Sequence, residues 1–185
     1  MNVYETGFAE LLVIEPKVFG DERGFFLESW NQKKLNDVLG KKINFVQDNH
    51  SKSALGTLRG LHFQTKNIQS KLVRVTSGSV FDVVVDLRKE QHTFGKTFSI
   101  NLTAENKKQL FIPKGFAHGF LALENETEFL YKCDDYYNPN FENSLLWNDL
   151  SLNIDWPIKD VSKLLISNKD AQGISFSEVN KIIFD

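Results

Sequence analysis

Cysteine is almost absent from this sequence. Cys133 is the only copy, which excludes an internal disulfide and a cysteine-based zinc finger. We therefore expect Cys133 to be a free buried thiol. Proline and methionine are also scarce, with four copies and one copy, and no proline-, glycine- or serine-rich linker divides the 185 residues. A chain of this length can bury one sizeable core, so we expect residues 1–185 to form a single domain.

Long apolar runs are missing as well. Residues 80–87 are the longest candidate, and Asp82 and Asp86 interrupt them. The first ten residues lack the basic start and the apolar core of a signal peptide, and they contain Glu5 and Glu10. A net charge of −2 and a pI near 6.1 provide no basic field for nucleic acid. We expect a soluble cytoplasmic protein that binds neither membrane nor nucleic acid.

Phenylalanine, in contrast, is abundant, with 16 copies, which suits a β-rich core. Turn residues separate eight predicted strands, at residues 45–49, 58–64, 71–76, 80–87, 97–102, 109–112, 116–123 and 127–134. Ser77-Gly78 is a predicted hairpin turn. In residues 80–87, apolar side chains alternate with Asp82 and Asp86, which predicts a strand with one face in a core. Many short antiparallel strands without helices between them indicate a sandwich or a barrel-like jelly roll.

Helical periodicity is weaker. Leu35, Val38 and Leu39 have helical spacing and Gly40 follows them, so we expect one amphipathic helix over residues 31–39. After residue 139 the pattern turns irregular. We expect the tryptophans at 147 and 156 to pack this segment against the barrel, and a last helix over residues 176–183.

The most informative stretch is residues 58–64, LRGLHFQ. Its alternation predicts a half-buried strand with His62 on the same face as Leu58, Gly60 and Gln64. A lone histidine on a strand is more often a satisfied core or rim residue than a catalyst. A regular strand would place Arg59 and His62 on opposite faces, but a bulge at Gly60 could bring both to one site.

A metal site is the first hypothesis to test. Residues 113–118, PKGFAH, resemble the second motif of the cupin superfamily, P-x-G-x-x-H. The first cupin motif should contain His-x-His, but here it reads His62-Phe63-Gln64, and glutamine is an infrequent metal ligand. His62 and His118 alone make a poor site for zinc or iron. We therefore expect a cupin-type jelly-roll barrel with short peripheral helices that needs no metal.

Without a metal, His62, His118, Lys71 and Tyr131 could still share a cavity. Tyr131 lies in residues 127–133, whose odd positions we expect to share one face. An inward tyrosine is usually a core residue whose hydroxyl has a partner. A histidine and a tyrosine on facing walls would also suit removal of a proton from one side of a carbon and its return from the other. A nearby lysine would stabilise an enolate.

Eight segments together closely resemble the dTDP-4-dehydrorhamnose 3,5-epimerase family. They are residues 21–28 (DERGFFLE), 45–49 (FVQDN), 58–64 (LRGLHFQ), 71–75 (KLVRV), 81–88 (FDVVVDLR), 113–120 (PKGFAHGF), 147–149 (WND) and 154–157 (IDWP). The resemblance covers almost the whole chain. It implies an isomerase of L-rhamnose and lipopolysaccharide biosynthesis that inverts carbons 3 and 5 of a 4-keto-6-deoxyhexose on dTDP, without a metal or an organic cofactor.

The resemblance also implies a role for each matched residue. His62 would be the proton acceptor, Tyr131 the proton donor, Asp170 the carboxylate that orients His62, and Lys71 the group that stabilises the enolate. Asp82 or Asp86 could replace Asp170 if that match is wrong. The implied substrate-binding residues are Gln47, Asp48, Asn49, Arg59, His118, Tyr137, Glu142 and Lys169. Arg23, Phe26 and Glu28 would reach the nucleotide from the partner of a homodimer that exchanges N-terminal strands.

Several alternatives remain open. A related enzyme of the same barrel could invert one centre only or act as a 3,4-ketoisomerase. A metal-dependent cupin oxygenase or isomerase is disfavoured by Gln64. A non-catalytic cupin that only binds sugar nucleotides would bind its ligand equally well after His62→Ala and Tyr131→Phe.

Overall fold

The computed structural model describes residues 1–179, 181 and 182. Strands dominate these residues, as the sequence predicts. The strands are β1 (Asn2–Glu5), β2 (Leu12–Glu15), β3 (Val18–Asp21), β4 (Gly24–Leu27), β5 (Gln47–Ser53), β6 (Thr57–Gln64), β7 (Lys71–Ser77), β8 (Ser79–Asp86), β9 (Thr97–Thr103), β10 (Gln109–Ile112), β11 (Phe116–Ala122), β12 (Thr127–Cys133), β13 (Glu142–Ser144) and β14 (Leu165–Ile166). The helices are α1 (Gln32–Leu39), the 3-10 helix η1 (Ile158–Asp160), α2 (Asn168–Ala171) and α3 (Phe176–Val179).

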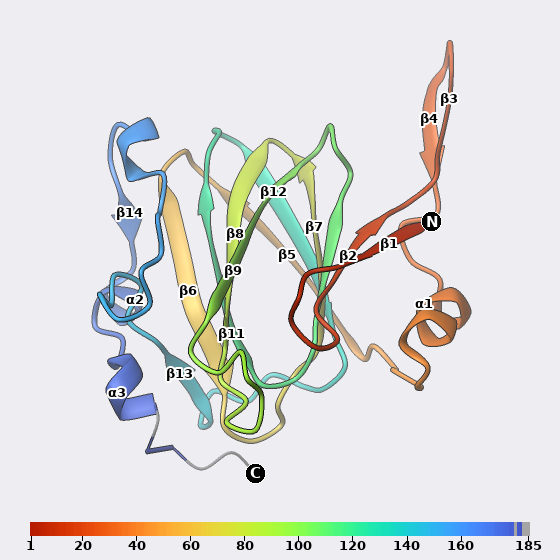
Figure 1. Ribbon diagram of the computed structural model, residues 1–185. Helices are drawn as coiled ribbons and strands as arrows, with labels where there is room; N and C mark the ends of the chain where they lie inside the picture. The colour runs from red at the N-terminus through yellow and green to blue at the C-terminus, as the bar shows by residue number, and fades with distance from the viewer. Residues whose placement is uncertain (180, 183–185) are drawn as a thin grey trace.

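Two antiparallel sheets form the body of the protein (Figure 1). The first has the strand order β1-β2-β10-β7-β12-β5, and the second has the order β13-β6-β11-β8-β9, with β14 added in parallel to β6. The expected mainly β fold, a cupin-type jelly-roll barrel with short peripheral helices, is confirmed. All eight predicted strands are present, although β5 begins two residues later than expected and continues to Ser53.

Ser77-Gly78 was predicted as a hairpin turn, and this prediction is wrong. β7 and β8 do not pair, because β7 lies in the first sheet and β8 in the second. Gly78 makes a sharp corner between the sheets with φ +70°, and a Cβ there would lie 2.4 Å from Oγ1 of Thr127. The absence of a side chain therefore allows β8 to start directly beside the first residue of β12.

Apolar clusters lie both between the sheets and outside them. The inner cluster includes Val80 and Val84 of β8, and the other face of β8 contributes Val83 and Val85 to a second cluster. The C-terminal segment covers that second face, where the Trp156 ring packs edge-on against Phe81 at 5.8 Å between centroids. This confirms that Trp156 packs the segment against the barrel. A third cluster packs α1 on the outer face of the first sheet.

Because both faces of β8 are covered, the prediction that only one of them lies in a core is wrong. Asp82 and Asp86 have an exposed fraction of 0%. A buried carboxylate needs hydrogen bonds or opposite charge, and both aspartates have such partners. Apolar side chains do alternate with Asp82 and Asp86 along β8. The alternation separates an apolar outer face from an inner face that contains both valines and aspartates.

The peripheral elements follow from local sequence. Asn31 caps α1 by accepting a hydrogen bond from the amide of Lys34, and Gly40 ends the helix with φ +65°. The hairpin β3–β4 extends away from the barrel (Figure 1). The last predicted helix is present as α3, whereas residues 180 and 183 of that prediction lie outside the described residues. Among the described residues, no helix is both long and apolar enough to cross a membrane.

Candidate active site

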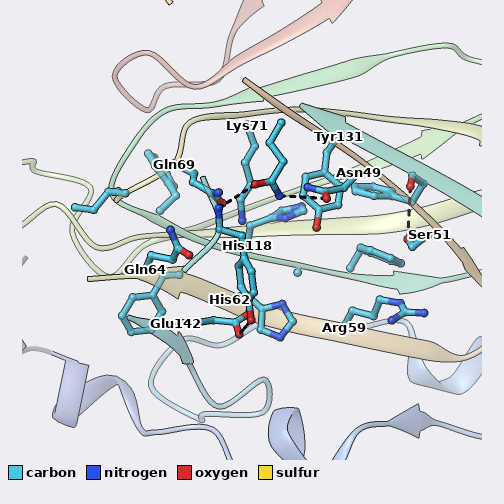
Figure 2. A pocket seen from close by; sticks show the side chains of 18 residues that line it. Asn49, Ser51, Arg59, His62, Gln64, Gln69, Lys71, His118, Tyr131 and Glu142 are labelled. Atoms are coloured by element: carbon cyan, nitrogen blue, oxygen red, sulfur yellow. Dashed lines mark hydrogen bonds between the residues drawn. The ribbon is translucent and has the colours of Figure 1, made fainter. Parts of the chain in front are cut away.

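A cavity of about 390 Å³ opens between the two sheets. It is lined by side chains of β5, β6, β7, β11, β12 and β13 and of the loops beside them. Figure 2 shows His62 and Glu142 on one side of this cavity and Lys71 and Tyr131 on the other. The site residues predicted from sequence that line it are Gln47, Asn49, Arg59, His62, Lys71, His118, Tyr131, Tyr137 and Glu142.

A bulge in β6 brings Arg59 and His62 into the same cavity. His62 is paired with His118 of β11, but Arg59 is paired with Phe120, so β6 contains one extra residue there. Gly60 permits the close approach of the strands, because a Cβ on it would lie 2.6 Å from Cα of Gly119. The bulge hypothesis is therefore confirmed.

Because of this bulge, Leu58 lies on the opposite face from His62, so the prediction that they share a face is wrong. Leu58 and Leu61 are buried in the cluster outside the second sheet, whereas His62 lines the cavity on the other side. Periodicity alone cannot detect this change, because it assumes that no residue is inserted in the strand.

His62 forms a short hydrogen bond with Asp170. Their Nε2 and Oδ1 atoms are 2.6 Å apart, and Asp170 has an exposed fraction of 4%. Burial opposes ionisation of Asp170, but the hydrogen bond and charge of His62 hold the pKa of this carboxyl below its ordinary value. The parallel pairing of β14 with β6 brings α2 to this position, and Ser167 caps α2. The sequence did not reveal Ser144, whose hydroxyl also donates to Asp170, at 3.2 Å.

Tyr131 and Lys71 lie on the opposite wall, on neighbouring strands of the first sheet. The Lys71 ammonium is 6.0 Å from the centroid of the Tyr131 ring. Burial lowers the pKa of Lys71 and raises that of Tyr131. The odd positions of β12 share one face as predicted, and the free thiol of Cys133 at its end is buried. Burial raises the pKa of Cys133 to about 11, so the thiol is neutral near pH 7.

His118 is bound to a different carboxylate. Its Nε2 atom is 2.9 Å from Oδ2 of Asp82. Asp86 bonds to Arg88 and Thr93. Each of the two alternative aspartates thus has its own partners, whereas His62 bonds to Asp170.

No group of three or more histidine, cysteine or acidic side chains within the described part of the chain is arranged to hold a metal ion. Gln64, at the position of a cupin metal ligand, instead binds the backbone of a neighbouring loop. Its amide accepts from the Asn138 N–H at 2.7 Å and donates to the carbonyl of Asn67 at 2.6 Å.

Polar side chains near the cavity form a connected chain of hydrogen bonds, part of which is drawn in Figure 2. Gln47 donates to Asn49 at 3.2 Å and accepts from the Tyr137 N–H at 2.9 Å. The Tyr137 hydroxyl donates to Glu142 at 2.6 Å, and Lys169 also pairs with Glu142. The bond to Glu142 raises the pKa of Tyr137 to about 12. Burial opposes ionisation of Glu142, but Lys169 and Tyr137 keep its pKa below the ordinary value.

Five of the predicted binding residues do not line this cavity. Lys169 is one of them, although it pairs with Glu142, which does line it. Asp48 was expected to line it, but alternation along β5 turns Asp48 to the other face, where it pairs with Lys132 at 2.7 Å. Arg23 and Phe26 lie on the protruding hairpin, and Glu28, which follows it, pairs with Lys34. Within one chain these three side chains remain remote from His62.

Other lining residues were not predicted. The polar ones are Ser51, Gln64 and Gln69, and Phe129 contributes a stacked ring beside His118, with 5.9 Å between the centroids. Ser51 could have been found, because it continues the alternation of Gln47 and Asn49 along β5. Gln69 lies in a loop, where periodicity carries no information.

Comparison with known proteins places the chain among a defined set of relatives. Residues 5–178 match the model of the family described as dTDP-4-dehydrorhamnose 3,5-epimerase. A protein of that name from Shigella flexneri is 53% identical over 99% of this chain and 100% of its own length. The crystal structure of an epimerase of Legionella pneumophila in complex with dTDP-4-keto-L-rhamnose is 47% identical, with a TM-score of 0.90 over 96% of both chains. ChmJ, a 3'-monoepimerase of Streptomyces bikiniensis, has a TM-score of 0.89 at 27% identity and covers 95% of this chain and 88% of its own.

Proposed function

Because this chain belongs to the dTDP-4-dehydrorhamnose 3,5-epimerase family and is therefore an isomerase, we propose that its cavity epimerises a dTDP-4-keto-6-deoxyhexose at carbons 3 and 5 through enolate intermediates. One observation carries the mechanism: the His62–Asp170 pair and Tyr131 stand on opposite walls of the same cavity. Inversion requires a base on one face of the carbon and an acid on the other. Every proton transfer uses side chains of the protein and water.

In this proposal His62 removes the proton next to the keto group. Nε2 of its neutral ring donates to Asp170, which leaves the lone pair of Nδ1 to accept the proton. The carboxylate fixes this tautomer and stabilises the imidazolium that forms. The C–H electron pair then becomes the enolate, whose negative charge falls on the oxygen of carbon 4.

Tyr131 returns a proton from the other face. Burial keeps its phenol protonated, as a proton donor must be at neutral pH. Lys71 on the same wall stabilises the enolate oxygen by its positive charge. His62 then gives its extra proton to water and the Tyr131 phenolate takes a proton from water, which resets both groups before the second carbon reacts.

Substrate binding is assigned to the remaining polar side chains of the cavity. Arg59 is the pyrophosphate partner, since a guanidinium meets phosphate oxygens through two parallel hydrogen bonds. His118, Gln47 and Asn49 contact the sugar nucleotide from the cavity wall. The chain formed by Tyr137, Glu142 and Lys169 supplies further contacts at its edge.

We also propose a homodimer that exchanges N-terminal strands. The hairpin β3–β4 exposes the rings of Phe19, Phe25 and Phe26, with exposed fractions of 53%, 63% and 69%. Exposed apolar side chains in such a cluster favour a protein partner. A second copy would cover them and receive Arg23, Phe26 and Glu28 at its cavity. The dimer of single-domain chains would act in the cytoplasm.

Mixing two inactive variants tests the exchange. Arg23→Ala removes the contribution of the hairpin and His62→Ala removes the base, so each homodimer should be inactive. Each mixed dimer would contain one intact site if the hairpin acts on its partner. Unfolding and refolding the two variants together should recover about a quarter of the wild-type activity, because half of the dimers are mixed. No recovery would mean that Arg23 acts within its own chain, and an active Arg23→Ala homodimer would mean that Arg23 does not act at all.

Deuterium uptake tests the reaction. The metal-stripped protein is incubated briefly with dTDP-4-keto-6-deoxyglucose in deuterated water, beside a blank without enzyme, and the sugar nucleotide is analysed by mass spectrometry. We expect about two deuterons per product molecule, since enolisation at each carbon exchanges one hydrogen. One deuteron would indicate a single-centre epimerase or a ketoisomerase, which the position of the label separates. No uptake would exclude the proposed substrate.

A further inference from the structure

Asp82 is a charged side chain in the most buried part of β8. Its exposed fraction is 0%, and its neighbours Val80 and Val84 on the same face belong to the apolar cluster between the sheets. Oδ2 binds His118, whereas Oδ1 has no hydrogen-bond partner among the described residues. An apolar side chain would stabilise such a position at least as well. The carboxyl therefore calls for a reason other than stability.

Two basic side chains of the cavity, His118 and Lys71, provide that reason. His118 is bonded to Asp82 directly, and the charge of Lys71 acts on it as well. Burial raises the pKa of Asp82, while His118 and Lys71 oppose that rise. In the reverse direction, burial lowers the pKa of Lys71 and the charge of Asp82 is one of the influences that counteract it. Asp82 and Lys71 thus favour each other's charged forms.

We propose that Asp82 is a positioning residue for the reaction: its carboxylate orients the ring of His118 and supplies negative charge that keeps the half-buried Lys71 as an ammonium facing the substrate. This inference rests on the proposed function, and Asp82 itself does not touch the substrate. Asp82 lies behind the wall of the cavity, which is lined by Lys71 and His118 but not by Asp82.

The sign of the pH effect depends on every group around Lys71. The titratable or charged groups that line the cavity with it or act on its charge are Arg59, His62, Asp82, His118, Tyr131, Cys133, Tyr137 and Glu142. Cys133, Glu142 and Asp82 favour its charged form, but the Cys133 thiol is neutral near pH 7. Replacing Asp82 with a neutral side chain removes one of the two carboxylates. The pKa of Lys71 should then fall further, so the enolate loses its cation at lower pH.

Asp82→Asn is the informative substitution, because an amide keeps the shape and an acceptor but not the charge. We expect the alkaline limb of the pH profile of kcat to move down by about 1–3 pH units. The lysine side-chain NMR signal of Lys71, assigned with Lys71→Arg, should show loss of the ammonium over the same lower range. This second measurement uses the protein without substrate, so it remains valid if the proposed reaction is wrong.

Asp86→Asn is the matched control. Asp86 lies four residues after Asp82 on the same face of β8 and is equally buried, but it bonds to Arg88 and Thr93 and does not line the cavity. This variant should lose stability without a shift of the alkaline limb. If Asp82→Asn does not fold, Asp82→Ser is measured in the same way.

Two outcomes would overturn the inference. A pH profile and a Lys71 titration that match the wild type would mean that Asp82 is an uncharged structural residue. An equal shift in Asp86→Asn would mean that the effect comes from loosened packing. If the proposed function is wrong, the wild type itself takes up no deuterium. That result differs from both outcomes above, which concern only the variants.

Discussion

His62→Ala is expected to reduce epimerisation by roughly 10²–10⁴-fold, which corresponds to a rise of about 3–5 kcal/mol in the activation barrier. The reason is geometric. His62 has the only imidazole among the described residues that both lines the cavity and bonds to Asp170. Glu142 lies on the same side of the cavity, but its carboxylate is held by Tyr137 and Lys169. Deuterium uptake should therefore fall in parallel with epimerisation, as measured by mass spectrometry and by chromatography of the product.

His50→Ala is the control for this substitution. His50 also lies on a strand beside a carboxylate, with its Nε2 atom 3.3 Å from Glu128, but it is half exposed and does not line the cavity. Its loss should change the rate by less than about twofold. If His62→Ala still exchanged deuterium at the wild-type rate, another group would be the base. A binding-only protein would show no turnover in the wild type and unchanged ligand affinity in the variant.

Local sequence was sufficient where local forces decide the structure. Alternation located β12 and the inward face of Tyr131, because a side-chain period of two is a property of every regular strand. Asn31 and Gly40 marked the two ends of α1, because the capping of a helix depends on a few adjacent residues. The single copy of cysteine predicted that Cys133 is a free buried thiol, which the structure confirms.

The errors arose where distant segments decide the structure. Both faces of β8 are buried because the C-terminal segment covers the second sheet, and nothing within residues 80–87 reveals that cover. Ser77-Gly78 has the composition of a hairpin turn, but the choice between a hairpin and a corner depends on which strands pair. Leu58 was assigned to the wrong face because periodicity assumes that no residue is inserted in the strand. Asp48 was assigned to the cavity by the resemblance, although alternation along β5 turns it to the other face.

The site itself was only partly accessible from sequence. His62 and Asp170 are separated by 108 positions, and the folding of the C-terminal segment against β6 brings them together. Asp170 was predicted from the resemblance to the family, because periodicity does not show which distant segments meet. Ser144 was not found from sequence because its hydroxyl acts on another side chain, Asp170, rather than on the cavity. Such supporting residues become visible only through their contacts.

Tyr131→Phe should separate exchange from inversion. The variant keeps His62, so it should still form the enolate and take up deuterium. Without the phenolic hydroxyl, however, the proton can return only from His62, on the face it left. We therefore expect inversion to fall by roughly 10²–10⁴-fold while exchange with retention of configuration persists. Proton NMR of the sugar ring measures configuration and label in the same sample.

A tyrosine outside the cavity provides the control for Tyr131→Phe. Tyr136→Phe removes a hydroxyl from an exposed tyrosine that does not line the cavity, and it should leave both rates unchanged. Equal loss of exchange and inversion in Tyr131→Phe would indicate that this tyrosine helps to form the enolate rather than to protonate it. Unchanged inversion would make water the donor. Persistent exchange with lost inversion can arise only if base and acid occupy different walls, which is the arrangement that His62 and Tyr131 have across this cavity.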